Sequence, residues 1–358
     1  MQSNKISFKG QKIFIGIDVH AKNWEVAIAP EVGIVKRHSQ KPSAKELFGF
    51  LKKNYPNGGY QAVYESGFSG FSTYYALKEV GIECMVIHAA DVPTTQYEEV
   101  MKTDRVDAVK LARSLKAGQL RGNYVLERQY IDDRSVVRIR KTIQKQLGGY
   151  KARVKHMLHC HGVEYPERFA KKQTHWSRAF ITWLIKDVRL MSDTRASLDL
   201  LIRQVEVIRG TLLEATRQLR KMSQTERYRR RHDLLRTIPG IGPVVSMSIL
   251  TEVCDMKRFH NEKEFAAYLG LIPTSHSSGE KTVHGEKTFR GNRLLGPMVV
   301  EAAWVAISWD AGLEAQYFQY RKRMKPQEAI VRIARKLSNI IFSVLKNEKE
   351  YVPYQEGN

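Results

Sequence analysis

Short runs of β-branched residues and amphipathic helical segments alternate in a fixed order along the first 116 residues. Three strands come first, joined by brief polar turns, and the order continues as helix, strand, helix, strand and helix. This order predicts a sheet that begins as an antiparallel meander and is extended by strands alternating with helices. The predicted strands are residues 12–19, 24–29, 32–38, 60–66 and 83–89, and the predicted helices lie within 42–58, 74–81 and 104–116.

Four acidic residues stand at the ends of these predicted elements. Asp18 ends the first strand, Glu65 ends the fourth, and Asp104 and Asp107 begin the last helix on one of its faces. The element order is that of an α/β RNase H-like domain, in which the first and fourth strands are neighbours. We therefore expect the four carboxylates to meet and bind Mg²⁺, whose charge relieves their mutual repulsion and which suits phosphoryl transfer. Alternatively, Asp104 and Asp107 only complement the helix dipole, and Glu65 is a turn residue.

The net charge indicates the class of partner. The 358 residues include 59 Lys and Arg against 37 Asp and Glu, a formal charge of +22, which predicts binding to polyanions and first of all to nucleic acid. No stretch approaches the roughly 20 apolar residues that span a bilayer, and the opening residues lack the apolar core of a secretory leader. We therefore expect a cytoplasmic protein with no membrane partner. The three cysteines lie too far apart to indicate a zinc site or a disulfide framework.

From residue 131 onward the strand pattern gives way to helical periodicity. We divide the chain into residues 1–130, an α/β domain, residues 131–226, a helical coiled-coil region, and residues 227–350, a mainly α domain. The middle region is also an expected site of homo-oligomerisation, as a dimer or tetramer, because its second apolar stripe is too narrow to cover a core alone and needs a partner, either the first stripe or another protomer. The stripes are Val136, Ile143, Leu147, Tyr150, Val154 and Met157, and Leu198, Leu201, Val205, Ile208, Leu212 and Leu219, with an aromatic helix around Trp176, Phe180 and Trp183 between them.

Two parts of the C-terminal region are expected to contact nucleic acid. The segment IPGIGPVVS resembles a helix-hairpin-helix element, in which Gly240 and Gly242 let the backbone approach a phosphate beside a helix N-terminus. Basic residues around a later Ser-Ser-Gly segment are candidate phosphate ligands, and these are Lys281, Lys287, Arg290 and Arg293. The alternatives are a tight turn between packed helices for the glycines and a solvated basic face for the side chains.

Several segments together match the pattern of one family. They are GIDVHAKNWEVAI around Asp18, YESGFSGF around Glu65, KTDRVDAVKLAR around Asp104 and Asp107, and, in the C-terminal half, IPGIGPVVS and LGLIPTSHSSGEKTVHGEKTFRGNRLL. On these segments the chain resembles the DEDD-type insertion-sequence transposases. The resemblance implies a RuvC-like N-terminal domain joined by a coiled coil to a C-terminal transposase domain that carries a serine nucleophile.

The resemblance also implies an activity and its partners. Such enzymes excise and insert their own mobile element, guided by an element-encoded structured RNA that pairs with the donor element ends and with the target DNA. Carboxylates corresponding to Asp18, Glu65, Asp104 and Asp107 bind magnesium while a serine attacks the DNA backbone. The matching serine is Ser278, directly before Gly279, or its neighbour Ser277. Without the resemblance, the Ser-Ser-Gly segment is a polar turn.

Two other functions fit parts of the sequence. A structure-specific nuclease of the junction-resolvase kind would use metal-activated water at the same carboxylates and would need no serine. A non-catalytic DNA- or RNA-binding protein would use the basic helices alone. The sequence leaves open the target site, the guide RNA, the number of protomers and whether serine and carboxylates meet within one protomer.

Overall fold

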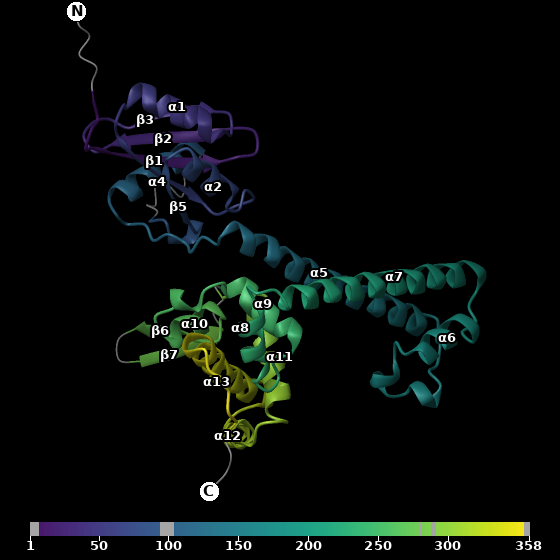
Figure 1. The fold of residues 1–358 in the computed structure, drawn as a ribbon. Helices are drawn as coiled ribbons and strands as arrows, with labels where there is room; N and C mark the ends of the chain where they lie inside the picture. The colour runs from purple at the N-terminus through teal and green to yellow at the C-terminus, as the bar shows by residue number, and fades with distance from the viewer. Residues whose placement is uncertain (1–6, 94–103, 279–280, 288–290, 354–358) are drawn as a thin grey trace, which may run out of the picture. The chain divides into compact units, whose positions relative to one another are not determined.

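The computed structural model describes residues 7–93, 104–278, 281–287 and 291–353. The chain divides into two compact units, residues 1–125 and residues 126–358 (Figure 1). The first unit is built on a sheet and the second is mainly helical. No helix in the described ranges has the length and apolar character needed to cross a membrane.

The first unit contains the predicted five-stranded sheet, in the order β3-β2-β1-β4-β5. The first three strands form an antiparallel meander, and β4 and β5 add to it in parallel, so that β1 and β4 are neighbours as expected. The strands are β1 (Lys12–Val19), β2 (Trp24–Pro30), β3 (Lys36–Gln40), β4 (Gly59–Glu65) and β5 (Glu83–Ile87).

The third strand begins later than predicted. Residues 32–35, which the prediction placed in a strand, form the connection from β2, and pairing starts at Lys36, opposite Ile28. Gly33 has a φ of 133°, and Val32 and Ile34 are exposed, Ile34 by 85%, so that only Val35 of this segment packs partly against the core. The apolar character of the segment was therefore misleading.

Helices cover the two faces of the sheet. On one face, α1 (Ala44–Asn54) and α2 (Ser72–Glu79) bury their apolar sides against alternate residues of β1, including Ile15 and Ile17. Ser43 caps α1 by accepting a hydrogen bond from the Glu46 amide at 3.2 Å. The opposite face is covered by α4, which spans the predicted Asp104–Lys116.

The contact between α4 and β1 is closest at Gly16. A Cβ atom at Gly16 would lie 2.1 Å from the carbonyl oxygen of Ala108 and 2.5 Å from the amide nitrogen of Ala112. At the other end of the helix, Lys116 Nζ donates to the Pro30 carbonyl at 3.0 Å, and Pro30 pairs with Ile13 near the start of β1. Helix α4 therefore runs opposite to β1, with its N-terminus at the carboxyl end of that strand.

The second unit begins with a helical hairpin, within the region that was predicted to be helical. Helices α5 (Arg128–Cys160) and α7 (Ser192–Ser223) pack together, and α6 (Arg178–Lys186) joins their core through Phe180 and Trp183. Trp176 lies outside α6, contrary to the prediction that it belongs to this helix. It has a φ of 70°, and the helix begins only after Ser177, which caps it.

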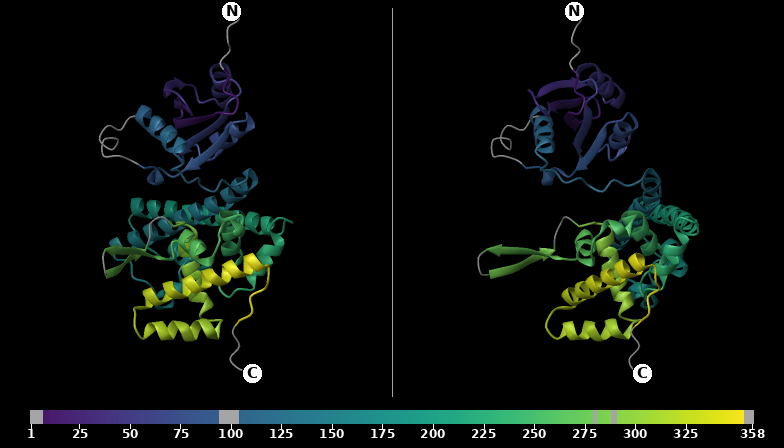
Figure 2. Two further views of the ribbon diagram at one scale, coloured as in Figure 1. Left: turned by 90° about the vertical axis from the view of Figure 1, so that its left-hand side faces the viewer. Right: turned by 60° about the vertical axis from the view of Figure 1, so that its left-hand side comes forward.

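The rest of the second unit is a helical core that carries a two-stranded ribbon. Figure 2 shows the ribbon extending from the helices. The helices are α8 (Arg229–Arg236), α9 (Pro243–Val253), α10 (Glu262–Tyr268), α11 (Leu295–Ala306), α12 (Ala311–Arg321) and α13 (Pro326–Asn347), and the strands are β6 (Pro273–Ser278) and β7 (Lys281–Lys287). The ribbon was not predicted, because its strands show no alternation of apolar and polar residues.

The Gly16 contact gives a stability prediction with an internal control. We expect Gly16→Ala to lower the free energy of unfolding by about 3 kcal/mol or more, because the methyl group meets backbone atoms that cannot rotate away. Gly49 lies in α1, and a Cβ atom there would have nothing within 4 Å, so Gly49→Ala should raise stability by up to about 1 kcal/mol. Urea unfolding of the full chain measures both. Equal midpoints for the two variants would contradict the packing.

Candidate functional site

The carboxyl ends of β1 and β4 bring two of the predicted acids to the same level of the sheet. The last partners in this parallel pair are Ile17 and Tyr64, and Asp18 and Glu65 are the next residue on each strand. Ile17 and Tyr64 are both buried against α1 and α2. Since successive side chains of a strand alternate between its faces, Asp18 and Glu65 lie on the opposite face, which α4 covers.

The direction of α4 brings its first turn toward the same end of the sheet. The helix meets β1 at Gly16 through Ala108 and Ala112, and Asp107 comes one residue before this contact. Asp107 is partly exposed. The helix begins at Asp104, whose side chain lies outside the described residues. The positive end of the helix dipole therefore points toward the strand ends that carry Asp18 and Glu65, which favours ionised carboxylates there.

Two neighbours of Asp18 were missed by the sequence reasoning. His20 Nε2 lies 3.1 Å from Asp18 Oδ2, and Glu25 is the residue directly opposite Asp18 on β2. Asn23 Nδ2 donates to Glu25 Oε1 at 3.3 Å. The signal was present in the sequence, because a tight turn at residues 20–23 between two strands places residues 18 and 25 opposite each other. The face under α4 therefore carries Glu25 as well as the predicted acids.

The chemistry of these side chains suits a hard cation better than a soft one. Carboxylate oxygens are the ligands that Mg²⁺ prefers; Asp18, Glu25 and Glu65 share one end and one face of the sheet, and Asp107 lies in the first turn of the helix that covers this face. Among the described residues, no three His, Cys, Asp or Glu side chains stand together as a metal-binding group. The described geometry thus offers oxygen donors but not a closed metal cage.

The predicted serines are the last two residues of strand β6. Ser277 pairs with Thr282 and Ser278 with Lys281 in the ribbon formed by β6 and β7. The side chains of this ribbon, including those of Lys281 and Lys287, and residue Arg290 lie outside the described residues. The backbone register nevertheless shows that both serines belong to the part of β6 farthest from the helical core.

The chain leaves and re-enters the helical core at one tightly packed point. A Cβ atom at Gly291 would lie 2.4 Å from the Cα of Gly270, so the two glycines hold both ends of the ribbon segment together. Asn292 secures the return: its amide donates to the Tyr268 carbonyl at 2.6 Å, and its Oδ1 accepts from the amides of Leu294 and Leu295 at the start of α11. The base of the ribbon is therefore fixed by backbone contacts and by one side chain.

Asn292 also reaches a buried ionic cluster. Glu252 in α9 is 1% exposed, and its carboxylate accepts from Asn292 Nδ2 at 3.1 Å and from Arg138 Nε at 2.7 Å, with Arg134 Nε 3.2 Å away. Burial lowers the pKa of Arg134, whereas the hydrogen bond to Glu252 raises the pKa of Arg138. Through this cluster, the base of the ribbon is linked to α9 and to the long helix α5.

The glycines of the predicted helix-hairpin-helix element lie between α8 and α9. Gly240 has a φ of 83°, and a Cβ atom there would lie 2.2 Å from the carbonyl oxygen of Ala302 in α11, so this glycine serves helix packing. Gly242 stands at the N-cap of α9, where a Cβ would lie 3.8 Å from Arg236 Nη1. Arg293 is exposed just before α11. Gly240 and Gly242 are both partly exposed, so all three residues stay available as predicted nucleic-acid contacts.

Comparison with known proteins gives matches in both units. Residues 15–161 match a family profile described as a transposase of the DEDD type in the IS110 group, and residues 232–318 match the profile described as transposase IS116/IS110/IS902 family. The first match contains Asp18, Glu65 and Asp107, and the second contains the ribbon and Asn292.

Individual relatives carry similar names. Two proteins of Sinorhizobium fredii named as transposases are 28% and 26% identical to this chain, the first over 67% of the chain and 57% of its own length, the second over 91% and 89%. The transposase for insertion sequence element IS1533 of Leptospira borgpetersenii is 23% identical over 70% of the chain and 72% of its own length. The match thus covers little more than half of the first relative but most of the other two.

The buried cluster gives a prediction for the second unit. We expect Glu252→Gln to lower the free energy of unfolding by about 3 kcal/mol, because two arginines then lose their only buried counter-charge within the described contacts. Glu301→Gln removes the same charge from the exposed surface of α11 and should change stability by less than about 0.5 kcal/mol. Urea unfolding compares the two variants, and similar midpoints would show that the cluster contributes little.

Proposed function

We propose that the chain is a DEDD-type insertion-sequence transposase, an enzyme that cuts and rejoins DNA, and that it works with a magnesium-dependent carboxylate site and a serine nucleophile. The proposed metal ligands are Asp18, Glu65, Asp104 and Asp107, in an RNase H-like (RuvC-like) domain. The proposed nucleophile is Ser278 or Ser277. A junction resolvase is not favoured, because both profiles and the named relatives are transposases.

One observation carries the carboxylate part of this proposal. Asp18 and Glu65 follow the paired residues Ile17 and Tyr64 on adjacent parallel strands, and the helix that contains Asp107 packs across the same face. The sheet order and the direction of α4 agree with an RNase H-like domain. When bound at these oxygens, magnesium would supply positive charge that stabilises the negative charge developing on phosphate in the transition state.

The residues of the chain have distinct tasks in this scheme. The carboxylates would hold the magnesium ions, whose charge would orient a DNA phosphate, and His20 holds the side chain of Asp18 through its hydrogen bond. The serine hydroxyl loses its proton and forms an Oγ–P bond while the phosphodiester bond to the departing DNA oxygen breaks and that oxygen takes up a proton. The phosphoserine conserves the bond energy, so a second DNA hydroxyl can displace the serine without another energy source.

The partners follow from the same proposal. Donor element ends, target DNA and a structured guide RNA would bind to a strongly basic chain, with a formal charge of +22. Proposed contacts are the backbone at Gly240 and Gly242 and the side chains of Lys281, Lys287, Arg290 and Arg293. We also propose the three-part division at residues 1–130, 131–226 and 227–350, with association of two or four protomers through the helical hairpin of α5 and α7.

The serine step has a direct test. Wild-type protein incubated with Mg²⁺, the element's RNA and end DNA should give a covalent protein–DNA adduct on a denaturing gel. Loss of the adduct in Ser278→Ala but not in Ser277→Ala, or the reverse, identifies the nucleophile, because each variant controls for the other. If both variants still cleave DNA and neither forms an adduct, the nucleophile is water and not a serine, and this part of the proposal is refuted.

The carboxylate step is tested separately. We expect Asp18→Asn and Asp107→Asn each to reduce adduct formation by about 100-fold or more, because a metal ligand is lost. His20→Gln should cost less, about 10-fold, since it only orients Asp18. Asp193→Asn, at the exposed start of α7, removes the same charge elsewhere and should retain wild-type activity. Full activity in Asp18→Asn and Asp107→Asn would refute the carboxylate site.

A further inference from the structure

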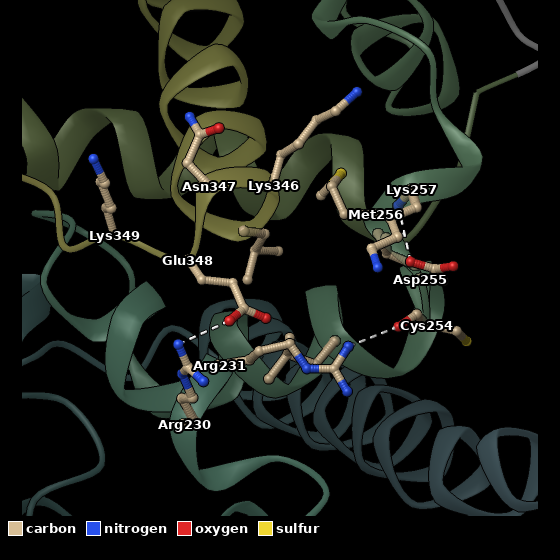
Figure 3. A pocket seen from close by; sticks show the side chains of 13 residues that line it. Arg230, Arg231, Cys254, Asp255, Met256, Lys257, Lys346, Asn347, Glu348 and Lys349 are labelled. Atoms are coloured by element: carbon tan, nitrogen blue, oxygen red, sulfur yellow. Dashed lines mark hydrogen bonds and ion pairs between the residues drawn. The ribbon is translucent and has the colours of Figure 1, made fainter.

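The second unit contains a cavity that none of the proposed functional residues lines. It has a volume of about 700 Å³, within the range of about 300–1,000 Å³ that is usual for ligand pockets. Its walls come from the first turn of α8, the end of α9 and the end of α13 (Figure 3). Residues 229–231 are three consecutive arginines that the proposed carboxylate and serine chemistry does not use. Two of them, Arg230 and Arg231, line the cavity.

The backbone is strained at two points of this cavity. Cys254 and Glu348 have φ angles of 63° and 51°, in the left-handed region that non-glycine residues rarely adopt, and both line the cavity. Only two other non-glycine residues in the described part of the chain, Asn57 and Trp176, have positive φ. Strained backbone of this kind is retained where the surrounding structure over-determines it, often at binding sites.

The cavity is lined by an excess of positive charge. Two acids, Asp255 and Glu348, face five basic residues, and Glu348 already pairs with Arg230 at 2.8 Å. Since α9 and α13 both end at the cavity, their dipoles add about half a negative charge each, which still leaves about two positive charges. The basic residues are Arg230, Arg231, Lys257, Lys346 and Lys349.

These basic side chains differ in how firmly they are held. Arg231 donates to the Cys254 carbonyl at 3.1 Å, and Lys346 Nζ donates to the His260 carbonyl at 3.1 Å, so both are fixed before any ligand arrives. Lys257 and Lys349 are exposed, and no side-chain hydrogen bond or ion pair engages them in the described structure. The cavity therefore combines fixed donors with two available ammonium groups.

We propose that this cavity binds the sugar–phosphate backbone of a nucleic-acid strand. Guanidinium and ammonium groups are the usual phosphate ligands, and the apolar floor formed by Leu250, Val253 and Met256 suits the sugar. The lining residues include no aromatic ring on which a base would stack, so the cavity holds the strand without reading its sequence. The inference rests on the proposed function only in taking nucleic acid as the partner.

Charge reversal at the two available lysines tests this site in the full chain. Lys257→Glu/Lys349→Glu is compared with Lys171→Glu/Lys186→Glu, which makes the same change of charge at exposed lysines around α6. Binding of single-stranded RNA and of duplex DNA is measured by fluorescence anisotropy with a chelator present, so that carboxylate chemistry does not contribute. We expect the cavity variant to bind at least about 10-fold more weakly than the control variant for at least one of the two nucleic acids.

The salt dependence of binding shows whether the weaker affinity comes from lost phosphate contacts, and which nucleic acid supplies those phosphates. The slope of log affinity against log salt is negative, and loss of two phosphate contacts lowers its magnitude by about 1.8 for duplex DNA and about 1.4 for a single strand. The nucleic acid that shows the change is the one that occupies the cavity. Equal affinities and equal slopes in the two variants, for both nucleic acids, would overturn the proposal.

A footprint on the unmodified protein guards against misfolded variants. Bound nucleic acid should protect Lys257 and Lys349 from acetylation in a mass-spectrometric assay and leave Lys171 and Lys186 reactive. Unchanged acetylation of Lys257 and Lys349 would also overturn the proposal. Asp107→Asn separates this outcome from failure of the proposed chemistry, because that variant should lose adduct formation and keep the footprint.

Discussion

The contact of helix α4 with strand β1 at Gly16 determines where the acids of the first unit can lie. Only a residue without a side chain lets the backbone of the helix come this close, since a Cβ would lie 2.1 Å from the Ala108 carbonyl oxygen. The contact also sets the direction of the helix, with Lys116 held at the Pro30 carbonyl and the N-terminus at the opposite end. The dipole of α4 can then offset part of the repulsion among carboxylates that share one sheet face.

Much of the first unit was predictable because its information is local. The strands and helices follow from periodicities of two and 3.6 residues, and the start of α4 was placed correctly at Asp104. Glu25 and His20 were missed because the sequence reasoning considered strand ends and not cross-strand partners. The late start of β3 was missed for a different reason: Val32 and Ile34 are apolar but exposed, so composition did not report burial there.

The second unit was less predictable because its decisive contacts join distant segments. In the sequence, nothing distinguishes Glu252 from any other polar residue in an apolar helix. In the structure it is buried, and its carboxylate accepts hydrogen bonds from Arg138 in α5 and from Asn292, which follows the ribbon in the chain. The backbone contact of Gly240 with a phosphate stays a prediction, but the close approach of Gly240 to Ala302 joins residues more than 60 positions apart in sequence and could not be predicted. The ribbon escaped prediction since the sequence of its strands shows no alternation of apolar and polar residues, and its strands pair with each other in a two-stranded sheet.

Several of the basic side chains behind the net charge of +22 are already paired within the fold. Arg134 and Arg138 are committed to Glu252, Arg230 to Glu348, and Arg231 to the Cys254 carbonyl, so these cations support the fold before they meet any ligand. Basic runs in a sequence therefore overstate the charge that is available at a surface. Lys257 and Lys349 stand in no such run, but the ends of α9 and α13 bring them to one cavity, where their charge is not consumed by a neighbour. For a protein of this charge, the nucleic-acid path is set by the cations that the fold leaves available, and these are found from tertiary contacts and not from composition.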